Sequence, residues 1–273
     1  MNAKIAVIPV FMLIAGVGIA NAAPKQDLVD FFVEQGCAIG PLTRAIARSA
    51  GFADTDIDAL VAEADDNAET IRTGDWVVLP TSLCRISPPD VRSEIRLDDP
   101  EVQAVTTSID AYAEFDEIGC FIDGPAIMER VQETRGWSRE KANTEYLWFL
   151  AENLRSHDIT FYSDDILKTP PGFQVLTGDC ADVPNIEDIR RSQVLRDREF
   201  DTLVRTDSRE VVCLRDDAPS YRFMELAHKL TGGENSNVFM SFEVKLMALG
   251  GGWFVGTSAT QKGTPRPPLC RFE

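Results

Sequence analysis

The sequence has few of the side chains that usually build metal or nucleophilic sites. It contains 2 histidines and 6 cysteines in 273 residues, and no two cysteines have the C-x-x-C spacing of zinc and redox motifs. No Gly-x-Ser-x-Gly segment is present to hold a nucleophilic serine. We therefore predict no metal site, no cofactor and no catalytic residue.

Basic side chains are also in the minority. Lys and Arg total 27 against 44 Asp and Glu, so the formal net charge is −17 at pH 7. Such a surface repels nucleic acid and anionic lipid alike. We therefore expect no nucleic-acid partner.

Long apolar runs are absent except at the N-terminus. Lys4 precedes an apolar run from Ile5 to Ile19, and Ala20-Asn21-Ala22 places small residues at the cleavage positions. The run is shorter than the ~20 residues that a spanning helix needs. The pattern predicts a signal peptide over residues 1–22, cleaved after Ala22, and a periplasmic or secreted protein with no further membrane span. An uncleaved anchor is the alternative.

A short pattern near the start of the mature chain recurs later. Residues 32–41 read FVEQGCAIGP, and residues 115–125 read FDEIGCFIDGP, in which Asp123 is inserted. The shared pattern is F-x-E-x-G-C-x-I-G-P. In both places Gly follows a predicted helix and Gly-Pro precedes the next one, which are usual helix boundaries.

The end of this first copy resembles the end of the chain. Its segments GDWVV at 74–78 and LCRI at 83–86 correspond to GGWFV at 251–255 and LCRF at 269–272. Because one copy matches a second at its head and a third at its tail, chance similarity is the weaker explanation. We predict three tandem repeat units, over residues 23–87, 99–183 and 186–273. A linker rich in proline and charge separates the first two.

The spacing of apolar residues predicts the fold class. In the first unit, helical periodicity covers about residues 27–35, 42–50 and 54–71, and the β-branched and aromatic residues 76–79 indicate a strand. In the second unit we expect the first helix from Asp99 to Phe115. Each unit is thus predicted as helix-helix-helix-strand, which makes the fold α+β and mainly helical. This element order resembles winged-helix modules, a resemblance of fold only.

The predicted strands leave one packing question open. A single strand in each unit would have two unpaired edges. The strand therefore pairs either with another segment of its own unit or with the strand of a neighbouring unit.

Each unit contains two cysteines, the first after a helix and the second after the strand. An even number of cysteines in an exported chain favours disulfides. The repeat therefore predicts the pairs Cys37–Cys84, Cys120–Cys180 and Cys213–Cys270, with no free thiol. In the chain-entropy model each bridge contributes roughly 4 kcal/mol, about the stability margin of a small domain.

Acidic residues in the first unit have the spacing of a calcium loop. The three are Asp54, Asp56 and Asp58, but Ala59 and Asp65 occupy the places where that loop needs Gly and Glu. We interpret them as the acidic start of a helix. Glu34 and Glu117 occupy equivalent repeat positions, and we interpret them as residues at helix ends.

The pair His157-Asp158 is the most suggestive of catalysis. It lies in a stretch, residues 157–168, that has no counterpart in the first unit. A His–Asp pair can act as a base, but no nucleophile accompanies it, so an exposed loop is the simpler interpretation. His228 has no partner in the sequence, and we expect it at a surface or core edge.

Three aromatic residues recur near the predicted strands, namely Trp76, Phe173 and Trp253. Packing against the helices of their own units is the simpler interpretation, and exposure on a binding face is the alternative. Arg85 and Arg271 each follow a closing cysteine and are candidates to pair with an acidic helix face.

Repeats create extended surfaces and clefts between units. We therefore expect a binding or interaction role, with an unknown protein or envelope ligand as the partner. The alternative is an envelope hydrolase with its site in a cleft between repeats near His157. A purely structural role is the third possibility.

Overall fold

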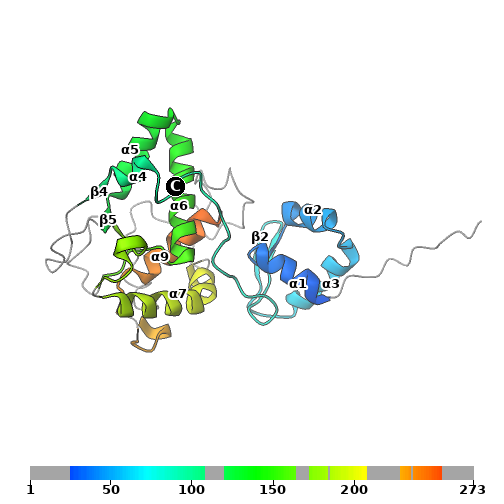
Figure 1. Ribbon diagram of the computed structural model, residues 1–273. Coiled ribbons are helices and arrows are strands. Elements are labelled where there is room, and N and C mark those ends of the chain that lie inside the picture. Colours follow the sequence, from blue (N-terminus) through cyan, green and yellow to red (C-terminus); the bar gives the residue numbers. More distant parts are fainter. Residues whose placement is uncertain are drawn as a thin grey trace, which may run out of the picture.

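The computed structural model describes residues 25–107, 120–163, 172–183, 185–207, 228–234 and 236–253. The predicted signal peptide and the predicted pair Cys213–Cys270 lie outside these residues. Within them the fold is α+β and mainly helical, with two small antiparallel sheets and two disulfides (Figure 1). No helix in this part of the chain is both long and apolar enough to cross a bilayer.

The described residues up to 87, which we call the N-terminal unit, form three helices and one sheet. The sheet has the order β1-β3-β2, and the central strand β3 is antiparallel to both neighbours. A disulfide between Cys37 and Cys84 ties the end of the first helix to the segment after β3. The elements are α1 (Lys25–Glu34), β1 (Ala38–Ile39), α2 (Pro41–Ser49), α3 (Asp54–Asp65), β2 (Ile71–Thr73) and β3 (Trp76–Val78).

The described residues between 99 and 183, which we call the central unit, contain the second sheet. Its order is β4-β5-β7-β6, and a disulfide joins Cys120 to Cys180. The elements are α4 (Pro100–Gln103), β4 (Thr106–Thr107), β5 (Phe121–Ile122), α5 (Gly124–Arg135), α6 (Arg139–Ser156), β6 (Ile159–Thr160), β7 (Phe173–Val175) and the 3₁₀ turn η1 (Gly178–Cys180).

The prediction of one strand in each unit is wrong for these two units. Each has a short strand after its first cysteine and a hairpin after its second long helix, so strands pair within their own unit. The third helix of the N-terminal unit ends at Asp65 and not near Ile71. It ends there because Asn67 Oδ1 accepts a hydrogen bond from Glu69 N at 2.9 Å, and Thr70 Oγ1 donates one to Ala64 O at 2.5 Å.

Two further expectations for the central unit need correction. The helix expected from Asp99 to Phe115 ends at Gln103, because Thr106 and Thr107 leave the helical path to pair with β5. Residues 108–119 lie outside the described part. The stretch after His157 is also not wholly additional, since Ile159–Thr160 forms strand β6, the counterpart of β2 in sheet order.

The last part of the described chain adds two helices, α7 (Ile186–Asp207) and α9 (Met240–Gly250). Helix α9 packs against both α6 and α7, and the N-terminal unit lies beside this group of helices (Figure 1). One hydrophobic cluster runs through all these parts, from Leu28 and Phe32 in α1 to Met247 in α9. The core is therefore continuous between segments that were predicted to be separate repeats.

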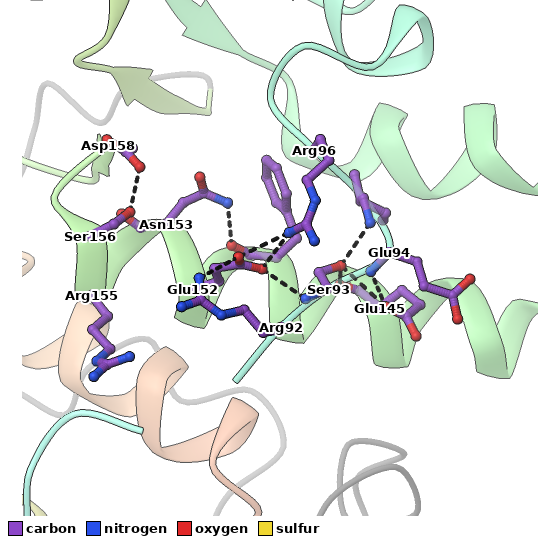
Figure 2. Close-up of polar contacts among 12 residues, drawn as sticks. Arg92, Ser93, Glu94, Arg96, Glu145, Glu152, Asn153, Arg155, Ser156 and Asp158 are labelled. Carbon is purple, nitrogen blue, oxygen red and sulfur yellow. Dashed lines mark hydrogen bonds and ion pairs between the residues drawn. The ribbon is translucent and has the colours of Figure 1, made fainter. Parts of the chain in front are cut away.

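The segment predicted to be a linker is a fixed strap. We call residues 87–99 the strap. Glu152 Oε2 accepts a hydrogen bond from Ser93 N at 2.7 Å, and Glu145 Oε2 accepts one from Glu94 N at 2.7 Å. Figure 2 shows how these two carboxylates of α6 hold the strap, with Arg96 reaching Glu152 at 2.9 Å. Charge-assisted hydrogen bonds of this kind keep the connection docked on the helix.

Candidate binding cleft

An open cleft of about 880 Å³ lies between the N-terminal unit and helices α6 and α9. The end of α1 and one face of α2 line it from the N-terminal unit, and the first residues of the strap line it between the two sides. Its size falls within the ~300–1,000 Å³ of typical ligand pockets. The lining residues are 33–36, Leu42, Ile46, 87–91, Trp148, Arg155, Gly250, Gly251 and Trp253.

Apolar side chains line two walls of the cleft. Leu42 and Ile46 lie one turn apart on α2, so both project from the same face of that helix. Trp148 of α6 and Trp253, after α9, contribute aromatic rings. Leu42 is 44% exposed, and in the described part of the chain the only other large hydrophobic residue this exposed is Val194. A concave surface that exposes apolar side chains is a candidate binding site.

The strap closes the cleft between these walls. Pro88 and Pro89 line the cleft where the strap crosses it. Because proline fixes the backbone dihedral φ, these two residues keep the segment extended. The ring of Pro89 packs so close to Gly251 that a Cβ on that glycine would lie 3.0 Å from Pro89 Cβ. Glycine at the end of α9 therefore allows the strap to seal this side.

Three charged side chains line the cleft, two acidic and one basic. Arg155 forms an ion pair with Asp90 of the strap, and Asp90 also lies 3.6 Å from Arg92. The third is Glu34, the last residue of α1. Helices α1 and α9 both end at the cleft, and a helix C-terminus carries a partial negative charge of about half an elementary charge.

The N-terminal unit is attached to α7 through the segment that follows β3. Thr81 Oγ1 donates a hydrogen bond to Asp201 Oδ2 at 2.8 Å, and Arg205 Nη2 donates one to Cys84 O at 2.9 Å. Arg85 likewise donates to the backbone carbonyl of Arg198 rather than to an acidic side chain. These contacts set the position of one cleft wall relative to the other.

The structure changes the interpretation of His157. Its Nε2 lies 2.7 Å from Asp197 Oδ2 of α7. Asp158 instead accepts a hydrogen bond from Ser156 Oγ at 2.5 Å, as Figure 2 shows. The partner of His157 is therefore a carboxylate 40 residues away and not its sequence neighbour. Its backbone is left-handed, with φ of 67°, because it caps the C-terminus of α6.

The contact between His157 and Asp197 belongs to a larger network of ion pairs that also includes Arg196 and Glu243. Burial raises the pKa of Asp197, but the hydrogen bond from His157 and the charge of Arg196 outweigh it, so the pKa is lowered. Arg196 in turn binds Glu243, 3.0 Å from Nη1 to Oε2, and both side chains are fully buried. Among the described residues, the ring of His157 has no hydrogen bond to a serine or cysteine, so no nucleophile is oriented beside it.

Two of the three acidic residues at the start of α3, Asp54 and Asp58, form ion pairs. Asp58 lies 2.7 Å from Arg44, and Asp54 lies 3.7 Å from Arg48. The helix begins at Asp54 with Ala53 as the N-cap, in agreement with an acidic first turn. In the part of the chain that the structure describes, no group of His, Cys, Asp and Glu has the arrangement of a metal site.

The recurring aromatic residues have different surroundings. The ring of Trp76 lies against Gly40, where a Cβ would collide with it, and Phe173 is buried in the core. Only Trp253 lines the cleft, although little of it is exposed. His228 is exposed, and Glu117 and Arg271 lie outside the described residues.

Sequence reasoning did not find the cleft. The one available signal is Leu42, an apolar residue directly after the Gly-Pro helix start, but its helical spacing is also that of a core residue. The chain matches no protein-family model, no curated protein and no solved structure. Its function is therefore argued from the geometry of the site.

Proposed function

We propose that this chain is an exported binding protein whose ligand occupies the cleft between the N-terminal unit and helices α6 and α9. The observation that carries the proposal is the concave apolar wall in which Leu42 remains 44% exposed. Burying an exposed leucine against a ligand is worth on the order of 1–2 kcal/mol. No catalytic group is required for this role.

The proposed compartment is the periplasm or the exterior. Two disulfides support it, because such bonds persist in oxidising compartments. The proposal includes a signal peptide over residues 1–22 and a third bridge between Cys213 and Cys270. Edman sequencing of the exported protein should begin at Ala23.

The proposed organisation is three repeats, over residues 23–87, 99–183 and 186–273. The two sheets support it, since β1-β3-β2 and β5-β7-β6 have the same order. The Gly-Pro helix starts support it as well. A Cβ on Gly40 would collide with Trp76, and a Cβ on Gly124 would collide with Tyr146 and lie 3.5 Å from Phe173. An aromatic ring thus lies against the glycine at the equivalent position of both units.

An envelope hydrolase acting near His157 is the second candidate function. The observation that favours it is the 2.7 Å contact between His157 Nε2 and Asp197 Oδ2, a geometry in which a carboxylate orients an imidazole. Under the binding proposal, His157→Gln and Asp158→Ala leave ligand capture unchanged. Loss of the biological phenotype in a folded His157→Gln variant, with capture retained, would favour the hydrolase.

The binding proposal is tested by affinity capture from an envelope fraction with three immobilised proteins. These are the wild type, Leu42→Asp in the cleft, and Val194→Asp as the matched control on α7. Because both substituted residues are exposed, all three proteins are expected to fold. A component retained by the wild type and the control but lost from Leu42→Asp supports the proposal. The proposal would be overturned if all three proteins retained the same components equally, or if none of them retained any.

A further inference from the structure

We propose that the cleft binds a cationic peptide segment, in which a Lys or Arg side chain is flanked by apolar residues. This inference rests on the proposed function and adds the chemical class of the ligand. It follows from three properties of the cleft, which are its unpaired carbonyl oxygens, its side-chain charge and its apolar walls.

The first property is a set of backbone carbonyls at two helix ends. After α1, the amides of Gly36 and Cys37 bond back to Val33 O and Phe32 O, at 3.0 and 2.7 Å. The carbonyls of Gln35 and Gly36 accept no hydrogen bond from the described residues. Both residues line the cleft.

The end of α9 repeats this arrangement. The amides of Gly251 and Trp253 bond back to Met247 O and Ala248 O, at 2.9 and 3.1 Å. Among the described residues no donor reaches the carbonyls of Gly250 and Gly251, which also line the cleft. Two helix C-termini whose last residues line one cavity thus have acceptors without donors among the described residues, and such ends favour cations.

The second property is the balance of side-chain charge. Among the described residues, Arg155 is the only basic residue that lines the cleft, and it forms an ion pair with Asp90. The acidic residues of the described lining are Asp90 and Glu34, so they outnumber the basic one. The net charge of the chain, −17, attracts a cationic ligand at longer range.

The third property is the apolar surface around these acceptors. Leu42 and Ile46 offer aliphatic contacts, and Trp148 offers an aromatic ring. Apolar walls bind residues that flank the basic side chain, and an aromatic ring also attracts a cation held over its face. A volume of about 880 Å³ exceeds the needs of a single side chain. A short peptide segment therefore fits the cleft better than a lone ammonium ion.

The test uses a displayed library of random ten-residue peptides. Selection is on the whole mature protein, with counter-selection on Leu42→Asp. We expect enriched sequences with at least one Lys or Arg between apolar residues. Enrichment of acidic or neutral peptides that still require Leu42 would overturn the inference while leaving the cleft as a binding site. If no enriched peptide depends on Leu42, a peptide ligand is wrong, and the proposed function is then judged by the envelope capture alone.

A second measurement tests the charge directly. The best-enriched peptide is synthesised with Lys and with acetyl-lysine at its basic position, and both are titrated calorimetrically. We expect the Lys form to bind about tenfold more tightly in low salt and to lose most of this advantage at high salt. Glu34→Gln should reduce the preference about threefold, whereas the exposed control Glu69→Gln should not change it. Equal affinity for both peptide forms would contradict the cationic class.

Discussion

Ile86 donates a backbone hydrogen bond to Asp201 Oδ1 at 2.6 Å, although the two residues are 115 positions apart. The same buried carboxylate accepts from Thr81 Oγ1 and from Arg205 Nε, at 2.8 and 2.9 Å. This side chain of α7 therefore binds the end of the N-terminal unit at two places, Thr81 and Ile86. Since that unit forms one wall of the cleft, α7 determines the position of a site that it does not line.

The first prediction concerns this carboxylate. Asp201→Ala removes the acceptor of several buried donors, so we expect it to lower the free energy of unfolding by about 3–5 kcal/mol. Asp188→Ala on the same helix is the control, because its carboxylate is exposed and should matter by at most ~0.5 kcal/mol. Urea denaturation followed by circular dichroism measures both. Equal unfolding midpoints would mean that Asp201 does not join the two parts.

The strap provides a second prediction. Glu152→Ala removes the carboxylate that holds Ser93 N, Arg92 and Arg96, so the strap should detach more often from α6. Trypsin should then cut after Arg92 or Arg96 at least several times faster than in the wild type. Glu133→Ala, which removes an exposed carboxylate of α5, is the control. An unchanged cleavage rate at both arginines would show that Glu152 does not hold the strap on α6.

A third prediction addresses the fully buried ion pair between Arg196 and Glu243. Glu243 also accepts hydrogen bonds from Thr160 Oγ1 and Phe161 N, at 2.8 and 2.7 Å. Glu243→Ala should cost about 3–5 kcal/mol of stability, because it leaves a buried guanidinium without this carboxylate. Replacing both residues by Met should cost much less. If the double variant is as unstable as Glu243→Ala, the unpaired guanidinium is not the cause of the loss.

A fourth prediction is a pH dependence in the central unit. The hydrogen bond from Arg135 is the main cause that lowers the pKa of Glu101 from its ordinary 4.5 to about 2. A lowered folded-state pKa contributes stability above pH 4.5, and that contribution is lost as the pH falls toward 2. Glu101→Gln should therefore cost about 1–2 kcal/mol at pH 7 and progressively less below pH 4.5. Urea denaturation at pH 7 and pH 3 measures the difference, and a constant difference would contradict this origin.

The fifth prediction is the disulfide map. A non-reducing tryptic digest should contain the linked pairs Cys37–Cys84, Cys120–Cys180 and Cys213–Cys270, with no free thiol. The first two pairs are present in the structure, and the third tests the proposed third repeat. A link from Cys213 or Cys270 to any other cysteine would contradict the three-repeat organisation.

Several local features were determined by the sequence alone. The Gly-Pro pairs start α2 and α5, and Ser138 caps α6 by accepting a hydrogen bond from Lys141 N at 3.2 Å. Cysteine positions in the recurring pattern predicted the two pairs that the structure contains. These features depend on residues a few positions apart, or on a repeated pattern, so the order of residues carries the information.

The strands and the cleft were decided only by the tertiary structure. Strands of two or three residues, such as Ala38–Ile39 and Ile159–Thr160, are too short to show an alternating pattern, and their pairing partners lie far along the chain. The partner of His157 and the docking of the strap on α6 also join distant segments. Leu42 has the helical spacing of a core residue. It is exposed because the opposite wall of the cleft comes from α6 and α9. The width of the cleft depends on those distant segments, so no local sequence pattern predicts it.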